Sequence, residues 1–258
     1  MCVTPYADVN RILDTVQSRI RDVVGTNLLA LYLTGSLVTG DFDHDVSDID
    51  LVAVTGAPID PGQLKELEAM HRELSIVEKQ WDNRIEVAYL STNALKTFRT
   101  QTSTIGITSP GEPFHTREAG IDWLINWYVV RRFGLTLFGP PPAAFIDPIS
   151  TQELVQAAQA RAIAWRHADH PRSRNAQVYA ILTMCRAFYT CRRSDYVSKN
   201  QAAIWTAETI PEWSPFIYAA LKSWREDWYN ENVNHEATLA ATTAFVRHVA
   251  ELIERDKR

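Results

Sequence analysis

The chain has 258 residues, of which 46% are hydrophobic, and its formal net charge is −5. This length suits one large domain or two smaller ones, and the hydrophobic fraction is enough to build their cores. Lysine and arginine are scattered along a mildly acidic chain, which argues against a nucleic-acid partner and is compatible with a cationic small molecule.

The cysteines and the lengths of the apolar segments indicate the cellular compartment of the protein. The three cysteines, Cys2, Cys185 and Cys191, have no paired metal spacing, so we expect neither a disulfide framework nor a zinc site. The chain lacks a leader pattern and an apolar run of the roughly 20 residues that span a bilayer. We therefore expect a soluble, cytoplasmic monomer without a membrane partner.

The first part of the chain alternates between helix-like and strand-like patterns. Apolar residues three and four positions apart predict a helix over residues 5–24, with Thr4 as its cap and Pro5 in its first turn. Asp60 and Pro61 predict the start of a second helix. Apolar runs predict strands over residues 28–33, 48–54 and 84–90. This order is typical of an α/β domain built around a mixed sheet.

The middle of the chain is less regular. Residues 96–120 are rich in Thr, Ser, Pro and Gly and show no clear period, so we expect a long, partly irregular loop there. Residues 121–133 are expected to be helical. Three consecutive prolines then interrupt residues 135–149, because proline fits neither a helix interior nor a central strand. We place a domain boundary here, which gives domains of residues 1–149 and 150–258.

The second domain is expected to be all-helical. Period and composition favour helices throughout it, over residues 150–167, 176–191, 200–209, 215–229 and 236–255.

One stretch of the first domain carries the pattern of a metal and phosphate site. An apolar run ends at Gly35 and Ser36, a polar loop follows, and Asp48 and Asp50 alternate with apolar residues at the start of the next run. Alternation by two places both carboxylates on one face of a strand. Two carboxylates beside a Gly-Ser turn with free backbone N–H groups suit a divalent metal bound to a polyphosphate.

A third carboxylate, Glu86, comes from the later strand and completes the set that nucleotidyl transfer needs. Asp48 and Asp50 would bind one or two Mg²⁺ ions, and Ser36 with nearby N–H groups would hold the triphosphate. Glu86 would be either a further metal ligand or the general base that deprotonates the attacking hydroxyl.

This constellation resembles the polymerase-β-like nucleotidyltransferase superfamily. Within it, the chain is similar to aminoglycoside adenylyltransferases of the streptomycin and spectinomycin type, which have a helical C-terminal domain. Besides Gly35-Ser36 and Ser47-Asp-Ile-Asp50, the similarity lies in segments 137–140 and 145–149, 182–189, and 197–205 with Ile210-Pro211. These segments follow one another in order through both domains.

The resemblance implies further nucleotide-binding residues. Arg186 and Lys199 match an arginine and a lysine that the helical domain of the family supplies to the ATP phosphates. Trp224 is the nearest match to an aromatic residue that closes over the nucleotide, and Ser47 matches a serine near the phosphates. Glu86 matches the catalytic base of the family.

The expected function is therefore an ATP- and Mg²⁺-dependent transfer of AMP to a hydroxyl of an aminoglycoside or aminocyclitol antibiotic. Residues 165–179 depart from the streptomycin enzymes, because they carry Arg172 and Arg174 where those enzymes have an acidic residue for the drug, with Asp169 as the only carboxylate nearby. Two alternatives stay open. The acceptor could be another antibiotic, a metabolite, a protein or an RNA, or the chain could bind nucleotide without turnover.

Overall fold

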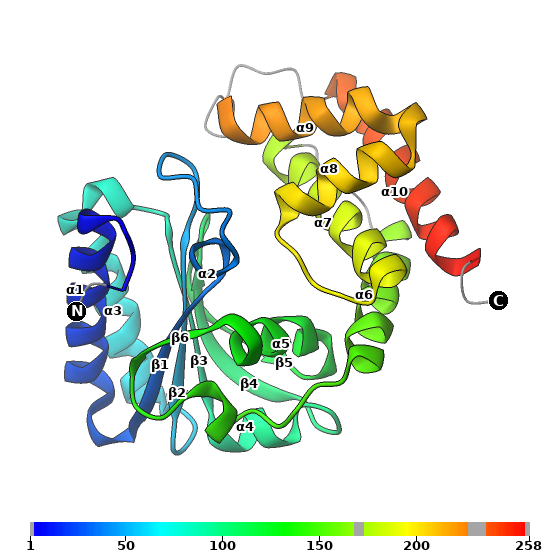
Figure 1. Cartoon of the computed structure of the whole chain (residues 1–258). Helices are drawn as coiled ribbons and strands as arrows, with labels where there is room; N and C mark the ends of the chain where they lie inside the picture. The colour runs from blue at the N-terminus through cyan, green and yellow to red at the C-terminus, as the bar shows by residue number, and fades with distance from the viewer. Residues whose placement is uncertain (1–2, 168–172, 227–235, 256–258) are drawn as a thin grey trace. The chain divides into compact units, whose positions relative to one another are not determined.

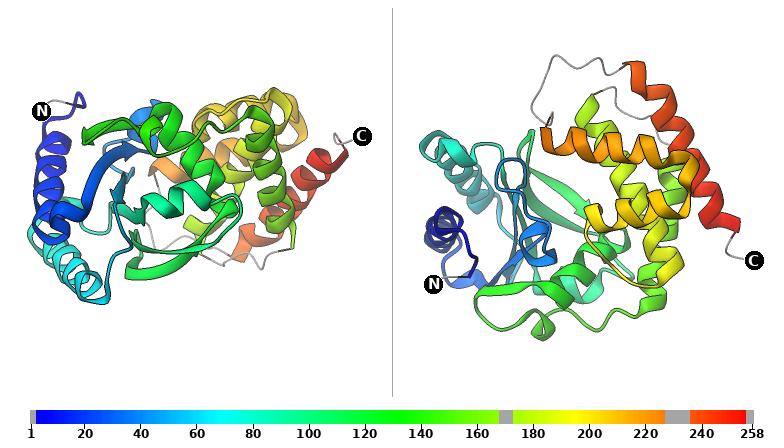
Figure 2. Two further views of the ribbon diagram at one scale, coloured as in Figure 1. Left: turned by 90° about the horizontal axis from the view of Figure 1, so that it is seen from below. Right: turned by 45° about the horizontal axis from the view of Figure 1, so that its top comes forward.

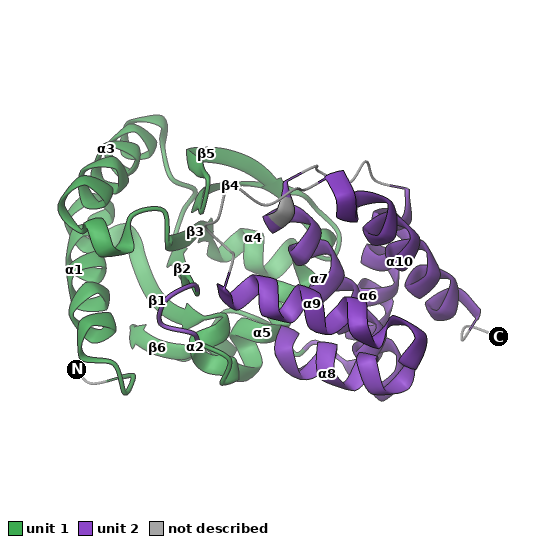
Figure 3. Cartoon of the chain, turned by 90° about the horizontal axis from the view of Figure 1, so that it is seen from above, with its two compact units in different colours: residues 1–42, 47–148 green, residues 43–46, 149–258 purple. Residues whose placement is uncertain are grey.

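The computed structural model describes residues 3–167, 173–226 and 236–255. By its internal contacts the chain divides into two compact units (Figures 1 and 3). Unit 1 comprises residues 1–42 and 47–148, and unit 2 comprises residues 43–46 and 149–258.

Unit 1 is built on a six-stranded sheet with the strand order β5-β4-β3-β2-β1-β6. Strands β2 and β3 run parallel, and the other neighbouring pairs are antiparallel, so the predicted mixed sheet is confirmed. The bounds are β1 Leu28–Thr34, β2 Ile49–Thr55, β3 Ile85–Ser91, β4 Ser103–Ser109, β5 Glu112–Ala119 and β6 Leu135–Phe138.

Helices α1 (Ala7–Val24) and α3 (Pro61–Val77) lie side by side on one face of this sheet (Figures 1 and 2). Alternate residues of the central strands, such as Leu33, Leu51 and Val87, are buried in the core that these helices cover. The period of two therefore turns Thr34, Asp50 and Glu86 toward the opposite face. Along β2 and β3, the core residues therefore lie on one face of the sheet, and the polar residues Asp50 and Glu86 lie on the other.

The two helix starts differ in how well the sequence predicted them. Asp60 caps α3 as expected, because its Oδ1 accepts bonds from Gly62 N at 2.7 Å and Gln63 N at 3.0 Å. The predicted cap of α1 is wrong, since that helix begins at Ala7. Thr4 is instead part of a buried turn with Asn10, whose Oδ1 accepts the Thr4 N–H at 2.9 Å. The competing side-chain bond delays the helix by two residues.

The predicted loop over residues 96–120 is wrong. Helix α4 (Thr92–Thr97) extends into it, and most of the rest forms the β4–β5 hairpin. Pro110 and Gly111 make its turn, with Gly111 at a φ of 78°. Thr and Ser suit the exposed face of an antiparallel pair, and Pro followed by Gly is a turn signal, so the composition that suggested a loop also fits a hairpin.

The remaining elements of unit 1 follow the hairpin. A short 3₁₀ turn, Ile121–Trp123, leads into α5 (Leu124–Phe133), which packs against β1. Strand β6 then joins the edge of the sheet beside β1. The three prolines, residues 140–142, follow β6 after Gly139, so none of them has to donate a bond within the sheet.

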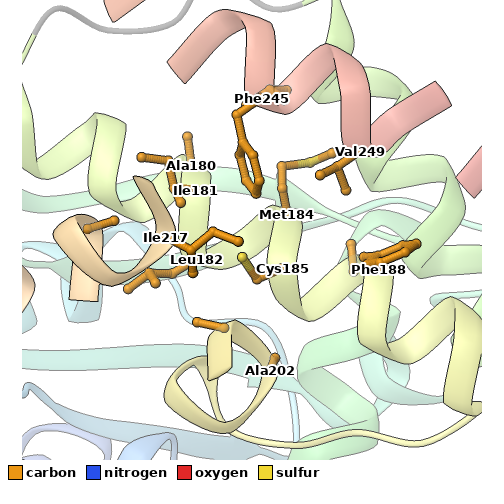
Figure 4. Close-up of a cluster of buried hydrophobic side chains, with 14 of the residues drawn as sticks. Ala180, Ile181, Leu182, Met184, Cys185, Phe188, Ala202, Ile217, Phe245 and Val249 are labelled. Atoms are coloured by element: carbon orange, nitrogen blue, oxygen red, sulfur yellow. The ribbon is translucent and has the colours of Figure 1, made fainter. Parts of the chain in front are cut away.

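Helices make up the regular structure of the described part of unit 2. Helix α7 is at the centre, and the others pack around it (Figure 4). Buried residues of α7, such as Leu182 and Phe188, meet Ile217 of α9 and Phe245 of α10. The predicted helices are confirmed here, except that residues 227–229 lie outside the described range. The bounds are α6 Thr151–Arg166, α7 Arg174–Arg193, α8 Lys199–Thr209, α9 Ser214–Glu226 and α10 Glu236–Arg255.

Within the described ranges, no helix has the length and apolar character needed to cross a membrane.

Candidate active site

A row of polar residues crosses the middle of the sheet in unit 1. Thr34 of β1 is the register partner of Asp50 of β2, and Asp50 is the register partner of Glu86 of β3. Neighbouring strands lie about 4.8 Å apart, and residues in register point to the same face. The structure therefore brings Asp50 and Glu86 side by side, on the face opposite the helices α1 and α3. Both carboxylates are partly exposed.

The backbone at Gly35 lies close to the carboxylate of Asp50. It has a φ of 68° and a ψ of −146°, a conformation that is essentially reserved for glycine. A Cβ added to Gly35 would overlap the side chain of Asp50, with Oδ2 as the nearest atom. The glycine thus has two physical reasons to be here, its backbone conformation and the space that the carboxylate occupies.

Ser36 follows as the first residue of the short helix α2 (Ser36–Thr39). The Gly35 carbonyl accepts bonds from Val38 N at 3.3 Å and Thr39 N at 3.2 Å, which winds the chain tightly after β1. The first N–H groups of such a turn have no acceptor inside it. The predicted Gly-Ser turn is thus present beside Asp50.

Asp48 lies one residue before β2, so the expectation that both aspartates belong to one strand is wrong by that residue. Ser47 is buried, and its carbonyl oxygen accepts bonds from the guanidinium of Arg84. The backbone on the other side of Asp48 is also bonded, because Ile49 N donates to Arg84 O at 2.8 Å. Asp48 is therefore held by residue 84, and Asp50 by the sheet ladder.

The donor set fits a magnesium ion that is bound together with a polyphosphate. Two carboxylates in register repel each other, and a divalent cation bound nearby would offset that repulsion. Magnesium is usually held by one or two protein carboxylates together with phosphate oxygens and water. In the ranges that the structure describes, no group of three or more His, Cys, Asp or Glu side chains is placed so that it could hold a metal ion by itself. A shared metal–phosphate site is consistent with both observations.

Two predicted phosphate-binding cations belong to unit 2, and a tyrosine holds each of them. Arg186 of α7 donates from Nη1 to Tyr196 Oη at 2.7 Å, and its guanidinium carbon lies 5.0 Å from the centre of the same ring. Lys199 Nζ lies 4.2 Å from the centre of the Tyr179 ring. These contacts place each cation against an aromatic ring of its own unit.

Lys199 is the first residue of α8, and Ser198 caps that helix by accepting a bond from Gln201 N at 3.2 Å. Trp224 of α9 is partly buried and packs against the helical core of unit 2. Of the stretch that departs from the streptomycin enzymes, Asp169 and Arg172 lie outside the described residues.

The sequence reasoning missed Arg84 and the two tyrosines. A single arginine before a strand has no period or motif that distinguishes it from a surface arginine. Tyr179 and Tyr196 were not singled out as partners either, because only the folded helices bring each of them next to its cation. The signal that could have found Arg84 is its place two residues before Glu86.

Two family models match the chain. A nucleotidyltransferase domain matches residues 10–101, which include Gly35, Asp48, Asp50 and Glu86. The C-terminal domain of aminoglycoside adenylyltransferases matches residues 144–251, which include Arg186 and Lys199. The two matches follow each other in the order that the sequence predicted.

Relatives of known function cover most of the chain. It is 25% identical over 240 residues to aminoglycoside (3'') (9) adenylyltransferases of Klebsiella pneumoniae and Escherichia coli, with 83% of this chain covered and 87% and 86% of theirs. The crystal structure of the spectinomycin adenyltransferase AAD(9) from Enterococcus faecialis has the same fold, with a TM-score of 0.74 over 93% of this chain and 98% of that one, at 19% identity. With both domain models matched in order, this chain belongs to the aminoglycoside adenylyltransferase family and is a nucleotidyltransferase.

Proposed function

We propose that the protein transfers AMP from ATP to a hydroxyl group of an aminoglycoside or aminocyclitol antibiotic. The observation that carries this proposal is the row of Asp50 and Glu86, closed by Gly35, in a chain whose curated relatives are named for the same reaction. Such a reaction needs ATP and Mg²⁺, and the cytoplasm supplies both. We further propose that the protein acts there as a monomer.

Each residue has a task that its place in the fold supports. Asp48 and Asp50 would hold Mg²⁺, which would neutralise charge on the triphosphate when it is bound. Ser36, Ser47 and the backbone after Gly35 would hold phosphate oxygens. Glu86 would take the proton from the acceptor hydroxyl while the hydroxyl oxygen forms a bond to the α-phosphorus of ATP. The bond between the α-phosphorus and the oxygen that bridges it to the β-phosphorus breaks, and pyrophosphate leaves.

The cations of unit 2 would complete the nucleotide site. Arg186 offers a planar fork for two phosphate oxygens, and Lys199 offers a point charge. Trp224 would contribute an aromatic surface near the nucleotide. If unit 2 supplies these groups and unit 1 the carboxylates, we expect ATP to bind before the acceptor.

The experiment is a mass-spectrometric screen. The protein is incubated with ATP, Mg²⁺ and a panel of streptomycin, spectinomycin, other aminoglycosides and lincosamides. We expect a mass gain of one adenylyl group on an aminoglycoside or aminocyclitol, and no gain with Asp50→Asn. ATP binding without any product on this panel would contradict the proposed acceptor class, and product on a lincosamide would replace it with another antibiotic.

A further inference from the structure

We propose that Arg84 is a positioning residue that fixes Asp48 for binding metal, and this inference rests on the proposed function. Asp48 lies before β2, outside the ladder that orients Asp50 and Glu86. It ends a loop that begins after α2, and the register pairs of β2 and β3 begin only at Ile49 and Ile85. Contacts outside those register pairs therefore have to order its backbone.

Arg84 bonds to the backbone on both sides of Asp48. Its Nε and Nη2 atoms donate to the Ser47 carbonyl oxygen at 3.1 and 2.6 Å. Its own carbonyl accepts the Ile49 N–H at 2.8 Å. These two groups belong to the peptide units that flank Asp48, so residue 84 restrains both backbone torsions of Asp48.

Arg84 is itself held rigidly. It is only 8% exposed, and its guanidinium carbon lies 4.9 Å from the centre of the ring of Trp81, which is 1% exposed. Its backbone N–H donates to Trp81 O at 3.1 Å, which closes a tight turn just before β3. Because the Arg84 side chain has little freedom to move, its bonds to the Ser47 carbonyl hold the end of the loop in a fixed position relative to β3.

The contact requires an arginine rather than any cation. Two N–H groups of one planar fork meet a single carbonyl oxygen while the flat face covers an indole ring. Lysine offers a point charge without that plane, so it cannot reproduce both contacts. Loss of a residue that orients a metal ligand without contacting the metal typically lowers metal affinity or activity by about 10- to 100-fold.

The test measures metal binding directly, without an acceptor. Electron paramagnetic resonance follows the titration of Mn²⁺ into the protein with ATP for the wild type and Arg84→Lys. We expect the Mn²⁺ dissociation constant to rise about tenfold or more in Arg84→Lys. The matched control is Arg99→Lys, because Arg99 also lies over an aromatic ring and donates to a carbonyl, that of Pro148 at 2.8 Å. It should leave the constant unchanged.

A double-mutant cycle separates positioning from general stability. If Arg84 acts through Asp48, then adding Arg84→Lys to Asp48→Asn should change the Mn²⁺ constant less than twofold. Circular dichroism establishes that each variant is folded, and a folded Arg84→Lys that binds Mn²⁺ as tightly as the wild type overturns the proposal. Effects that multiply in the double variant also overturn it, because they would show independent action.

The failure of the proposed function would look different. A wild-type protein that binds Mn²⁺ with ATP but modifies no antibiotic contradicts the acceptor class and leaves this test intact. A wild-type protein that binds no Mn²⁺ with ATP overturns both.

Discussion

Gly35 shows how one residue can set the geometry of the carboxylates. The conformation of Gly35 is essentially matched by Gly25, which has a φ of 60° and a ψ of −137°. The two glycines differ in their surroundings, because a Cβ at Gly25 would meet nothing within 4 Å, whereas a Cβ at Gly35 would overlap Asp50. Substituting each glycine in turn therefore separates the effect of backbone strain, which both substitutions cause, from the effect of displacing Asp50, which only the change at Gly35 causes.

We predict that Gly35→Ala lowers the rate of adenylyl transfer by about 100-fold or more, because displacing a site group by about 1 Å can cost that much. Gly25→Ala should keep the wild-type rate. Both variants should lose about 1 to 3 kcal/mol of unfolding free energy through strain, measured by urea denaturation. Equal rates in the two variants would show that Asp50 does not have to stay against Gly35.

A second prediction distinguishes the two roles open to Glu86. We expect Glu86→Gln to lower kcat by about 100-fold or more, as the loss of a general base does, while the affinity for Mn²⁺ with ATP changes by less than about threefold. Stopped-flow transfer assays and Mn²⁺ titration measure the two quantities. A large loss of Mn²⁺ affinity would instead make Glu86 a metal ligand.

At the scale of elements, the sequence predicted the strands of the site better than the rest of the sheet. The runs that form β1, β2 and β3 have strong apolar periods, so they were found within a residue or two. The β4–β5 hairpin and β6 were missed because edge and half-exposed strands carry polar residues, and their pairing depends on a partner that is distant in sequence. Arg84 was missed for another reason, because a single arginine before a strand has no period or motif that distinguishes it from a surface arginine.

One contact between elements predicts how the stability of unit 1 depends on pH. His71 of α3 bonds through Nε2 to Tyr89 Oη of β3 at 2.7 Å, and its ring stacks on Phe114 of β5. Burial lowers the pKa of His71 from 6.5 to about 4 and raises the pKa of Tyr89. His71 is therefore neutral in the folded protein at pH values at which it is protonated in the unfolded chain.

We predict that unfolding free energy falls as the pH drops from 6.5 to about 4, because the unfolded chain binds the additional proton in this window. The contribution of His71 is about 3 kcal/mol. Urea denaturation at several pH values should show a shallower fall for His71→Gln. Tyr89→Phe keeps the buried histidine and should keep the slope. An unchanged slope in His71→Gln would assign the acid sensitivity to other groups.

At the scale of the whole molecule, the sequence predicted an α/β domain followed by helices, because prolines interrupt the chain between two different periodic patterns. Arg186 and Lys199 were found only through the resemblance to a family, since a helix arginine and lysine have no distinctive pattern of their own. The structure adds that tyrosines hold both cations. It also shows that the carboxylates and the cations belong to different units.

The last prediction tests whether unit 2 contributes to the nucleotide site. We expect Lys199→Ala to raise the dissociation constant of ATP about tenfold or more, since a charged hydrogen bond contributes about 1.5 to 3 kcal/mol. The KM of the acceptor at saturating ATP should stay nearly constant, because the lysine is assigned to phosphate. Lys222→Ala is the control, as that side chain is 70% exposed and pairs with Glu226 along α9. Isothermal titration gives the ATP constants. Equal weakening of ATP and acceptor would contradict a phosphate-binding role for Lys199 and would point instead to a general change in unit 2.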